Sequence, residues 1–145
     1  MDFLKIKKII DLTKKIGISP FGYFIFGSPG ETLESINTTI NLFLNSNLDY
    51  IQISRVCPWP GSELYKDWKA HNNSDMWLDY VVGKIPQWYK LQPPLTELSI
   101  EDLDMLIKKA YRKFYLRPSY IKERFLSLKS SHEFLNHLKG FLLSH

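Results

Sequence analysis

The feature that most constrains this chain is a short, uncharged apolar run from Phe21 to Phe26, bounded by Pro20 and Gly27. A run of this length between proline and glycine is typical of a strand that is buried on both faces. A helical pattern follows over residues 33–44, and a second strand-like run extends over residues 50–56. Strand, helix and strand in this order, with a crossover of this length, predict a βαβ unit and therefore a parallel sheet.

Helices are expected on both sides of this unit. Apolar residues spaced among lysines predict an amphipathic helix over residues 4–15, which stops at Gly17. The central helix has Thr32 as its predicted N-cap, and Ser62 is the predicted cap of a short helix over residues 63–70. Residues 71–95 are loop-like but rich in aromatic side chains, which we expect to pack against something because they are costly to leave in water.

The last third of the sequence is helical in character. Ser99 and Asp102 resemble a capping box at the start of a long helix. Arg117-Pro118 opens a further helical turn or two, and residues 130–142 suit a last capped helix. We therefore divide the chain into an α/β part over residues 1–70, an aromatic-rich connection over 71–97 and a helical tail over 98–145. Two parallel strands do not make a stable sheet, so the chain reads as one end of something longer.

Composition excludes several classes of protein. Hydrophobic residues make up 44% of the chain and charged residues 23%, which allows a packed core. No apolar run approaches the roughly 18–20 residues that span a bilayer, and the charged N-terminus is unlike a signal peptide. These observations predict a soluble, cytoplasmic protein with no membrane partner.

The sequence gives little support for a metal site or a nucleic-acid site. Cys57 is the one cysteine, so the chain has neither an intrachain disulfide nor a C-x-x-C pair, and its four histidines are scattered. We expect no metal site held by this chain alone. Residues 108–129 carry five lysines and three arginines against one acid, Glu123. A solvated helix surface explains this stretch better than a nucleic-acid site, because no binding signature accompanies it.

Three segments in the expected order carry a resemblance to a known family. The segment from Gly22 to Thr32, GYFIFGSPGET, resembles the fifth barrel strand and turn of radical S-adenosylmethionine enzymes. Residues 50–56 with the exit PWPGSELY, residues 58–65, look like the sixth strand. The run AYRKFYLRP, residues 110–118, is similar to the helical tail of the cobalamin-binding branch.

The resemblance implies the C-terminal part of a partial TIM-type (β/α)6 barrel, followed by an all-helical tail. In such enzymes a three-cysteine motif binds a 4Fe–4S cluster, which cleaves S-adenosylmethionine to a radical that abstracts a substrate hydrogen. Carried onto this chain, Ile25 would pack on the adenine of the cofactor, Gly27 and Gly30 would let the backbone approach it, and Val56 would line the pocket from the next strand. Free backbone groups beside an apolar strand end suit an adenine ring, and ligands of parallel α/β folds sit at the carboxyl ends of strands.

The chain also departs from the family pattern. No C-x-x-x-C-x-x-C motif is present. The cluster and cobalamin of a full-length relative would therefore not be bound by this chain alone, and no catalytic residue can be assigned. Some family members have an acid where Gly30 stands. Here the acid is Glu31, which we interpret as a charge near a helix N-terminus. We interpret Cys57 as a buried apolar thiol, because no histidine lies close in sequence to act as its base.

Two functions follow from these observations. In the first, the chain is a fragment of a radical S-adenosylmethionine enzyme, a cobalamin-dependent methylase or cyclase being one form, and is inactive without the missing N-terminal half. In the second, it is a non-catalytic split subunit that completes the barrel of a separately encoded partner, which its exposed strand edges would favour. Trp59, Trp77, Trp88 and Tyr89 are interpreted as packing residues rather than substrate contacts.

Overall fold

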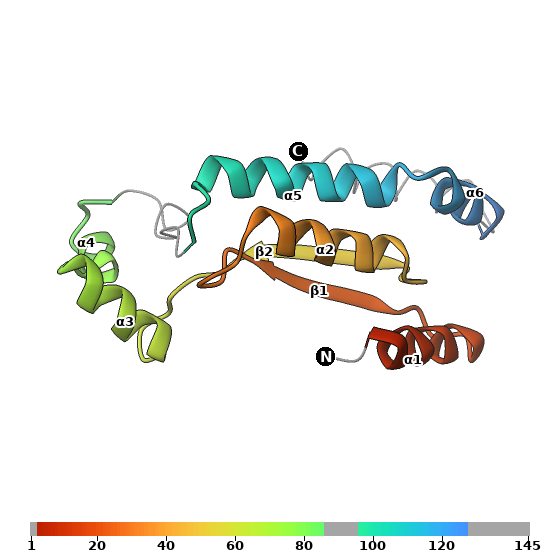
Figure 1. The fold of residues 1–145 in the computed structure, drawn as a ribbon, viewed down its shortest axis with the longest axis horizontal. Coiled ribbons are helices and arrows are strands. Elements are labelled where there is room, and N and C mark those ends of the chain that lie inside the picture. Colours follow the sequence, from red (N-terminus) through yellow and green to blue (C-terminus); the bar gives the residue numbers. More distant parts are fainter. Residues whose placement is uncertain (1–2, 86–95, 128–145) are drawn as a thin grey trace. The chain divides into compact units, whose positions relative to one another are not determined.

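A computed structural model describes residues 3–85 and 96–127 of the chain (Figure 1). Its elements, in order, are α1 (Phe3–Lys15), β1 (Phe21–Phe26), α2 (Leu33–Leu44), β2 (Tyr50–Arg55), α3 (Glu63–Asn72), α4 (Met76–Val81), α5 (Ile100–Tyr115) and α6 (Pro118–Ser127). The predicted last helix over residues 130–142 lies outside the described residues. No helix in the described part is both long and apolar enough to cross a bilayer.

The predicted βαβ unit is confirmed. Strands β1 and β2 pair in parallel, with Phe21 opposite Tyr50 and Phe26 opposite Arg55, and α2 is the crossover helix between them. Helix α2 begins as predicted, since Thr32 accepts a hydrogen bond from the backbone N–H of Ser35 and the Ser35 hydroxyl accepts one from Thr32. This reciprocal pair satisfies two backbone donors that the first helical turn leaves without partners.

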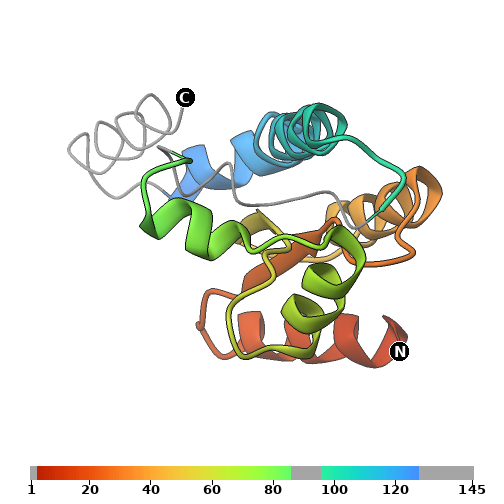
Figure 2. The ribbon, with the colours of Figure 1, turned by 90° about the vertical axis from the view of Figure 1, so that its left-hand side faces the viewer.

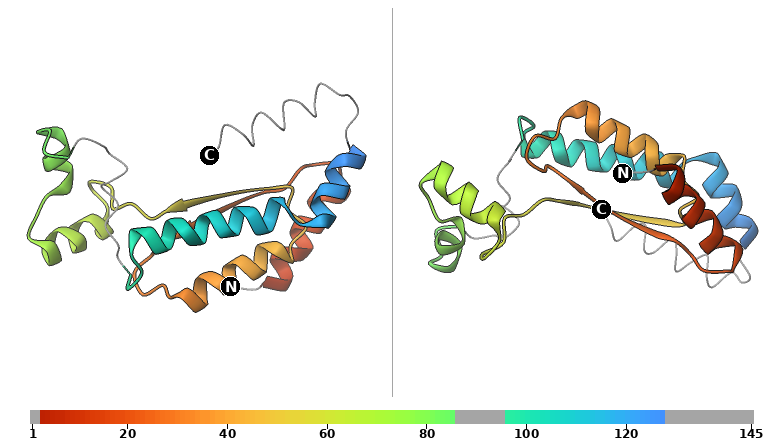
Figure 3. Two further views of the ribbon diagram at one scale, coloured as in Figure 1. Left: turned by 90° about the horizontal axis from the view of Figure 1, so that it is seen from above. Right: turned by 60° about the horizontal axis from the view of Figure 1, so that its bottom comes forward.

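One face of the sheet carries the core. The Phe24 ring lies 4.9 Å from the ring of Phe43 on α2, and Arg55 forms a 3.2 Å ion pair with Asp104 on α5. Both helices therefore meet the same side of the strands, as the views in Figure 3 also show. The buried apolar side chains of this layer come from both strands, α2, the connection between α2 and β2, and the first part of α5: Phe26, Ile36, Ile40, Phe43, Leu48, Ile51, Ile53, Leu103, Leu106 and Ala110.

The opposite face of the sheet is exposed, so one prediction for β1 is wrong. We expected β1 to be buried on both faces, but Phe21, Tyr23 and Ile25 are 46%, 74% and 60% exposed. The physical reason is that α2 and α5 both cover the other side, so alternate residues of the strand point away from them. The sequence pattern for a doubly buried strand is present, whereas the second covering layer is absent from the described residues.

The segment after β2 contains a helix that was not predicted. Residues 71–95 were expected to be loop-like, yet Met76–Val81 forms the short helix α4, which Asp75 caps by accepting from the Leu78 N–H. Helix α3 is confirmed with its Ser62 cap and extends to Asn72. Figure 2 looks from the carboxyl ends of the strands, with α3 and α4 in front.

The chain separates into two compact units, residues 1–110 and residues 111–145. In the second unit, Phe114 is fully buried and its ring lies 5.5 Å from that of Tyr120, with the Arg117 guanidinium 4.2 Å from the Phe114 ring centre. The predicted starts of two helices are confirmed: α5 begins after Ser99, and α6 begins at Pro118. At the start of α5, the Asp102 carboxylate accepts a hydrogen bond from the Ser99 hydroxyl at 2.7 Å, and the Asp102 N–H donates one to the Ser99 hydroxyl at 3.0 Å. The boundaries after residues 70 and 97 stay a prediction.

Candidate functional site

The candidate site begins with the open face of the sheet. Side chains of paired residues in a parallel sheet point to the same face, and alternate residues point to opposite faces. The open face is therefore formed by three residues of each strand: Phe21, Tyr23, Ile25, Tyr50, Gln52 and Ser54. It has two halves, because the aromatic residues lie at the amino ends of the strands and Ile25 with Ser54 at the carboxyl ends.

The aromatic half is closely packed. The Phe21 ring lies 4.6 Å from that of Tyr23 and 6.0 Å from that of Tyr50, both in stacked orientations. Stacked rings at the amino ends of the strands fill that part of the face with apolar surface. The carboxyl half is less crowded: Ile25 is exposed beside Ser54, its direct neighbour on β2, and both Ser54 and Gln52 are exposed. A ligand that met this half would find one aliphatic side chain, one hydroxyl and one amide.

A tight turn follows directly from the carboxyl end of β1. Gly27 and Gly30 have φ angles of +91° and +75°, which side chains rarely allow. The Glu31 carboxylate closes the turn by accepting hydrogen bonds from the N–H groups of Gly27, at 2.5 Å, and Ser28, at 3.2 Å. The Glu31 N–H donates in turn to the Ser28 carbonyl at 3.0 Å. Glu31 therefore fixes the loop between strand and helix.

Gly27 is also a packing site. A methyl group added to it would lie 3.0 Å from Leu103 Cδ1 on α5 and 3.5 Å from Val56 Cγ1. Val56 itself is held by a 2.8 Å hydrogen bond from its N–H to the carbonyl of Phe26. The ends of both strands and the start of α5 thus meet around Gly27. At Gly30, by contrast, an added methyl group would find nothing within 4 Å.

The four predicted cofactor residues are therefore placed differently. Ile25 is exposed on the open face, and Gly30 is exposed at the tip of the turn. Gly27 is buried and lies next to half-buried Val56. The structure brings Gly27 and Val56 together, but it gives the Gly27 N–H to Glu31 rather than to a ligand. Their contact with adenine stays a prediction.

The interpretation of Glu31 as a charge near a helix N-terminus is incomplete. Glu31 directly precedes Thr32, the N-cap of α2, but its carboxylate turns back onto the N–H groups of the preceding turn. The available signal was an acid four residues after a glycine that ends a strand.

Cys57 was interpreted as a buried apolar thiol. In the structure it is half-buried, and burial raises the pKa of its thiol. In residues 3–85 and 96–127, no three His, Cys, Asp or Glu side chains gather in a way that could hold a metal ion.

Comparison with known proteins relates the chain to two enzymes. It is 30% identical over 115 residues, 77% of its length, to an uncharacterised methyltransferase of Pyrococcus horikoshii. It is 26% identical over 142 residues, 95% of its length, to the anaerobic magnesium-protoporphyrin IX monomethyl ester cyclase of Rubrivivax gelatinosus. The chain spans about a quarter of each relative, 24% in both cases. No family model matches the chain. The chain is thus a distant relative of a methyltransferase and of a cyclase.

Proposed function

We propose that this chain is the C-terminal part of a radical S-adenosylmethionine enzyme, in which the open face and its turn form the adenine side of the cofactor pocket. The observation that carries the proposal is the exposed Ile25 at the carboxyl end of β1, beside a turn closed by Glu31. The resemblance in residues 22–32 and the two distant relatives support it.

The charge of the turn favours this ligand over a phosphate. Glycine-rich turns between a strand and a helix often bind phosphate through free N–H groups. Here the N–H groups of Gly27 and Ser28 already donate to the Glu31 carboxylate, whose negative charge would repel a phosphate. S-adenosylmethionine carries no phosphate, and its sulfonium is positively charged. An apolar side chain for the purine and a nearby carboxylate suit this cofactor.

A 4Fe–4S cluster does not fit the residues of this chain. Such clusters are held by several cysteine thiolates, and Cys57 is the one cysteine. Burial also raises the pKa of that thiol. Another segment of polypeptide would have to supply the thiolates, and we assign no step of cluster chemistry to this chain. Its own residues would bind and orient the nucleoside.

A non-catalytic subunit that completes a partner's barrel is the second candidate. The exposed apolar side chains of β1 favour it, because a separate partner could cover them as well as a preceding segment could. The two candidates differ in whether the cluster-binding cysteines share a polypeptide with this chain. They make the same prediction for the pocket.

The test is anaerobic reconstitution of the chain with a cysteine-bearing segment, either encoded upstream or in a co-purifying partner. The measurement is the formation of 5′-deoxyadenosine from S-adenosylmethionine by liquid chromatography. We expect Ile25→Asp to abolish product formation, since it places a charge where the purine would pack. Ile16→Asp is the matched control. Ile16 directly follows α1, is 74% exposed and does not belong to the open face. Equal activity of Ile25→Asp and the unaltered protein would refute the proposal, as would iron bound by this chain alone.

A further inference from the structure

A pair of stacked tryptophans follows the carboxyl end of β2. The Trp59 and Trp77 rings lie 4.8 Å apart with 30° between their planes, and Trp77 meets Tyr80 edge to face at 6.4 Å. Trp59 stands four residues after the strand and is 55% exposed. We call Trp59 and Trp77 the tryptophan shelf. We interpreted both as packing residues. Trp77 is half-buried, as this interpretation requires, whereas much of Trp59 is exposed to solvent.

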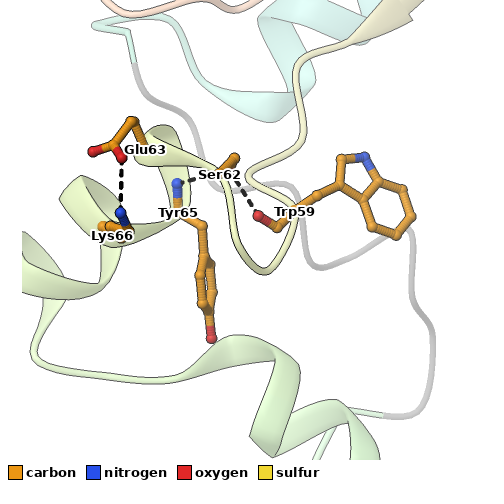
Figure 4. A network of polar contacts seen from close by, with 5 residues as sticks. All are labelled: Trp59, Ser62, Glu63, Tyr65 and Lys66. Atoms are coloured by element: carbon orange, nitrogen blue, oxygen red, sulfur yellow. Dashed lines mark hydrogen bonds and ion pairs between the residues drawn. The ribbon is translucent and has the colours of Figure 1, made fainter.

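The backbone under Trp59 is held from both sides. The Trp77 indole N–H donates to the Pro58 carbonyl at 2.8 Å. The Ser62 hydroxyl donates to the Trp59 carbonyl at 2.7 Å and accepts from the Tyr65 N–H at 3.1 Å (Figure 4). Figure 4 also shows the Trp59 ring pointing away from this hydrogen-bonded turn. The ring is thus exposed on a rigid support, which lowers the entropic cost of binding a ligand to it.

Helix α4, which carries Trp77, is fixed to α3 in turn. Asp75 accepts hydrogen bonds from the Tyr65 hydroxyl and from Lys69, the latter at 2.7 Å. Trp68 of α3 and Met76 of α4 form a small buried cluster, against which Tyr65 and Trp77 pack. Trp77 is therefore held in place by the contacts of Asp75 with Tyr65 and Lys69 and by packed apolar side chains.

We propose that the outer face of Trp59 is the floor of a binding site for a planar conjugated ring of the substrate. A flat, rigid indole at the carboxyl end of a strand matches a flat ring, since offset stacking uses the whole face and needs no surrounding groove. The inference rests on the proposed function for its place beside the cofactor. It goes beyond that function in naming the class of substrate.

The test uses this 145-residue chain with protoporphyrin IX as a probe for large rings and adenosine as a probe for purines. Binding of the porphyrin is followed by the shift of its own absorption band, so loss of a tryptophan does not remove the signal. We expect Trp59→Leu to weaken porphyrin binding about tenfold, the effect of losing one stacked aromatic face. Trp59→Phe should restore most of the affinity. Circular dichroism shows whether each variant keeps its helices.

Adsorption to exposed apolar surface is controlled by Leu4→Ser, which removes a side chain that is 82% exposed on α1. Equal losses in Trp59→Leu and Leu4→Ser would overturn the inference. So would adenosine that displaces the porphyrin from Trp59 at lower concentration, because the shelf would then belong to the cofactor. The outcome is independent of the proposed cofactor pocket, since Ile25→Asp should leave porphyrin binding unchanged while abolishing 5′-deoxyadenosine formation in the reconstituted enzyme.

Discussion

Replacing Gly27 with alanine tests how the strand ends are joined to α5. Gly27 has a φ of +91°, so any L-residue there is strained by about 1–2 kcal/mol. The new methyl group would also lie 3.0 Å from Leu103 Cδ1, closer than ordinary van der Waals contact. Overpacking of this kind costs about 1–3 kcal/mol. We therefore expect Gly27→Ala to destabilise the chain by about 2–5 kcal/mol.

Gly30→Ala is the matched control. Its φ is +75°, so the strain is similar, but an added methyl group meets nothing within 4 Å. We expect a loss of about 1–2 kcal/mol, from strain alone. Both variants keep the backbone N–H of residue 27, from which the Glu31 carboxylate accepts a hydrogen bond. The difference between the two therefore isolates the contact with Leu103.

Thermal unfolding followed by circular dichroism measures this difference. A loss of 1 kcal/mol lowers the midpoint of a domain of this size by about 3–4 °C, so Gly27→Ala should melt at least about 3 °C below Gly30→Ala. Equal melting temperatures, or a lower one for Gly30→Ala, would refute the packing of α5 against the strand ends. The double variant Gly27→Ala with Leu103→Ala should lose less stability than the sum of the two single losses, because the added methyl group no longer meets Leu103.

Three further predictions concern single side chains. Glu31→Gln should cost about 1 kcal/mol in urea unfolding, because a neutral amide accepts more weakly from the Gly27 and Ser28 N–H groups; the same loss in Glu34→Gln would contradict it. The hydrogen bond to Asp75, with burial, raises the pKa of Tyr65 to about 12, so the stability from this bond is present below about pH 10 and lost as the pH rises through 12. A tyrosinate difference titration against Tyr65→Phe should show that midpoint, and a midpoint near 10 in the unaltered chain would be inconsistent with the bond. Cys57 should react with iodoacetamide more slowly in the folded chain than in urea, since burial raises its pKa; equal rates would argue against this.

The parts of the fold that local chemistry determines could be predicted from the sequence. The βαβ unit follows from two apolar runs around an amphipathic helix, and the caps at Thr32, Ser62 and Ser99 follow from their side chains. Gly17 also ends α1 as expected, with a φ of +82°. Each of these features depends on residues within a few positions of one another.

The parts that depend on distant contacts could not be predicted. Helix α4 has six residues, too few for a periodic pattern, and depends on contacts such as that of Trp77 with Pro58. The exposure of Ile25 depends on which side of the sheet α2 and α5 cover. The role of Glu31 depends on the turn that two glycines with positive φ create. A partial barrel remains a proposal, since the described residues contain two strands.

The most direct test of the central claim is a nuclear magnetic resonance titration of the isotope-labelled chain with 5′-deoxyadenosine at millimolar concentration. We expect chemical-shift changes at the Ile25 methyl groups, at the amides of residues 27–30 and at Val56, with none in α6. The changes at the amides of residues 27–30 and at Val56 should vanish in Ile25→Asp, and all of the changes should persist in Ile16→Asp. No change at these positions, or changes centred on another part of the chain, would contradict the assignment of this face to the adenine of the cofactor.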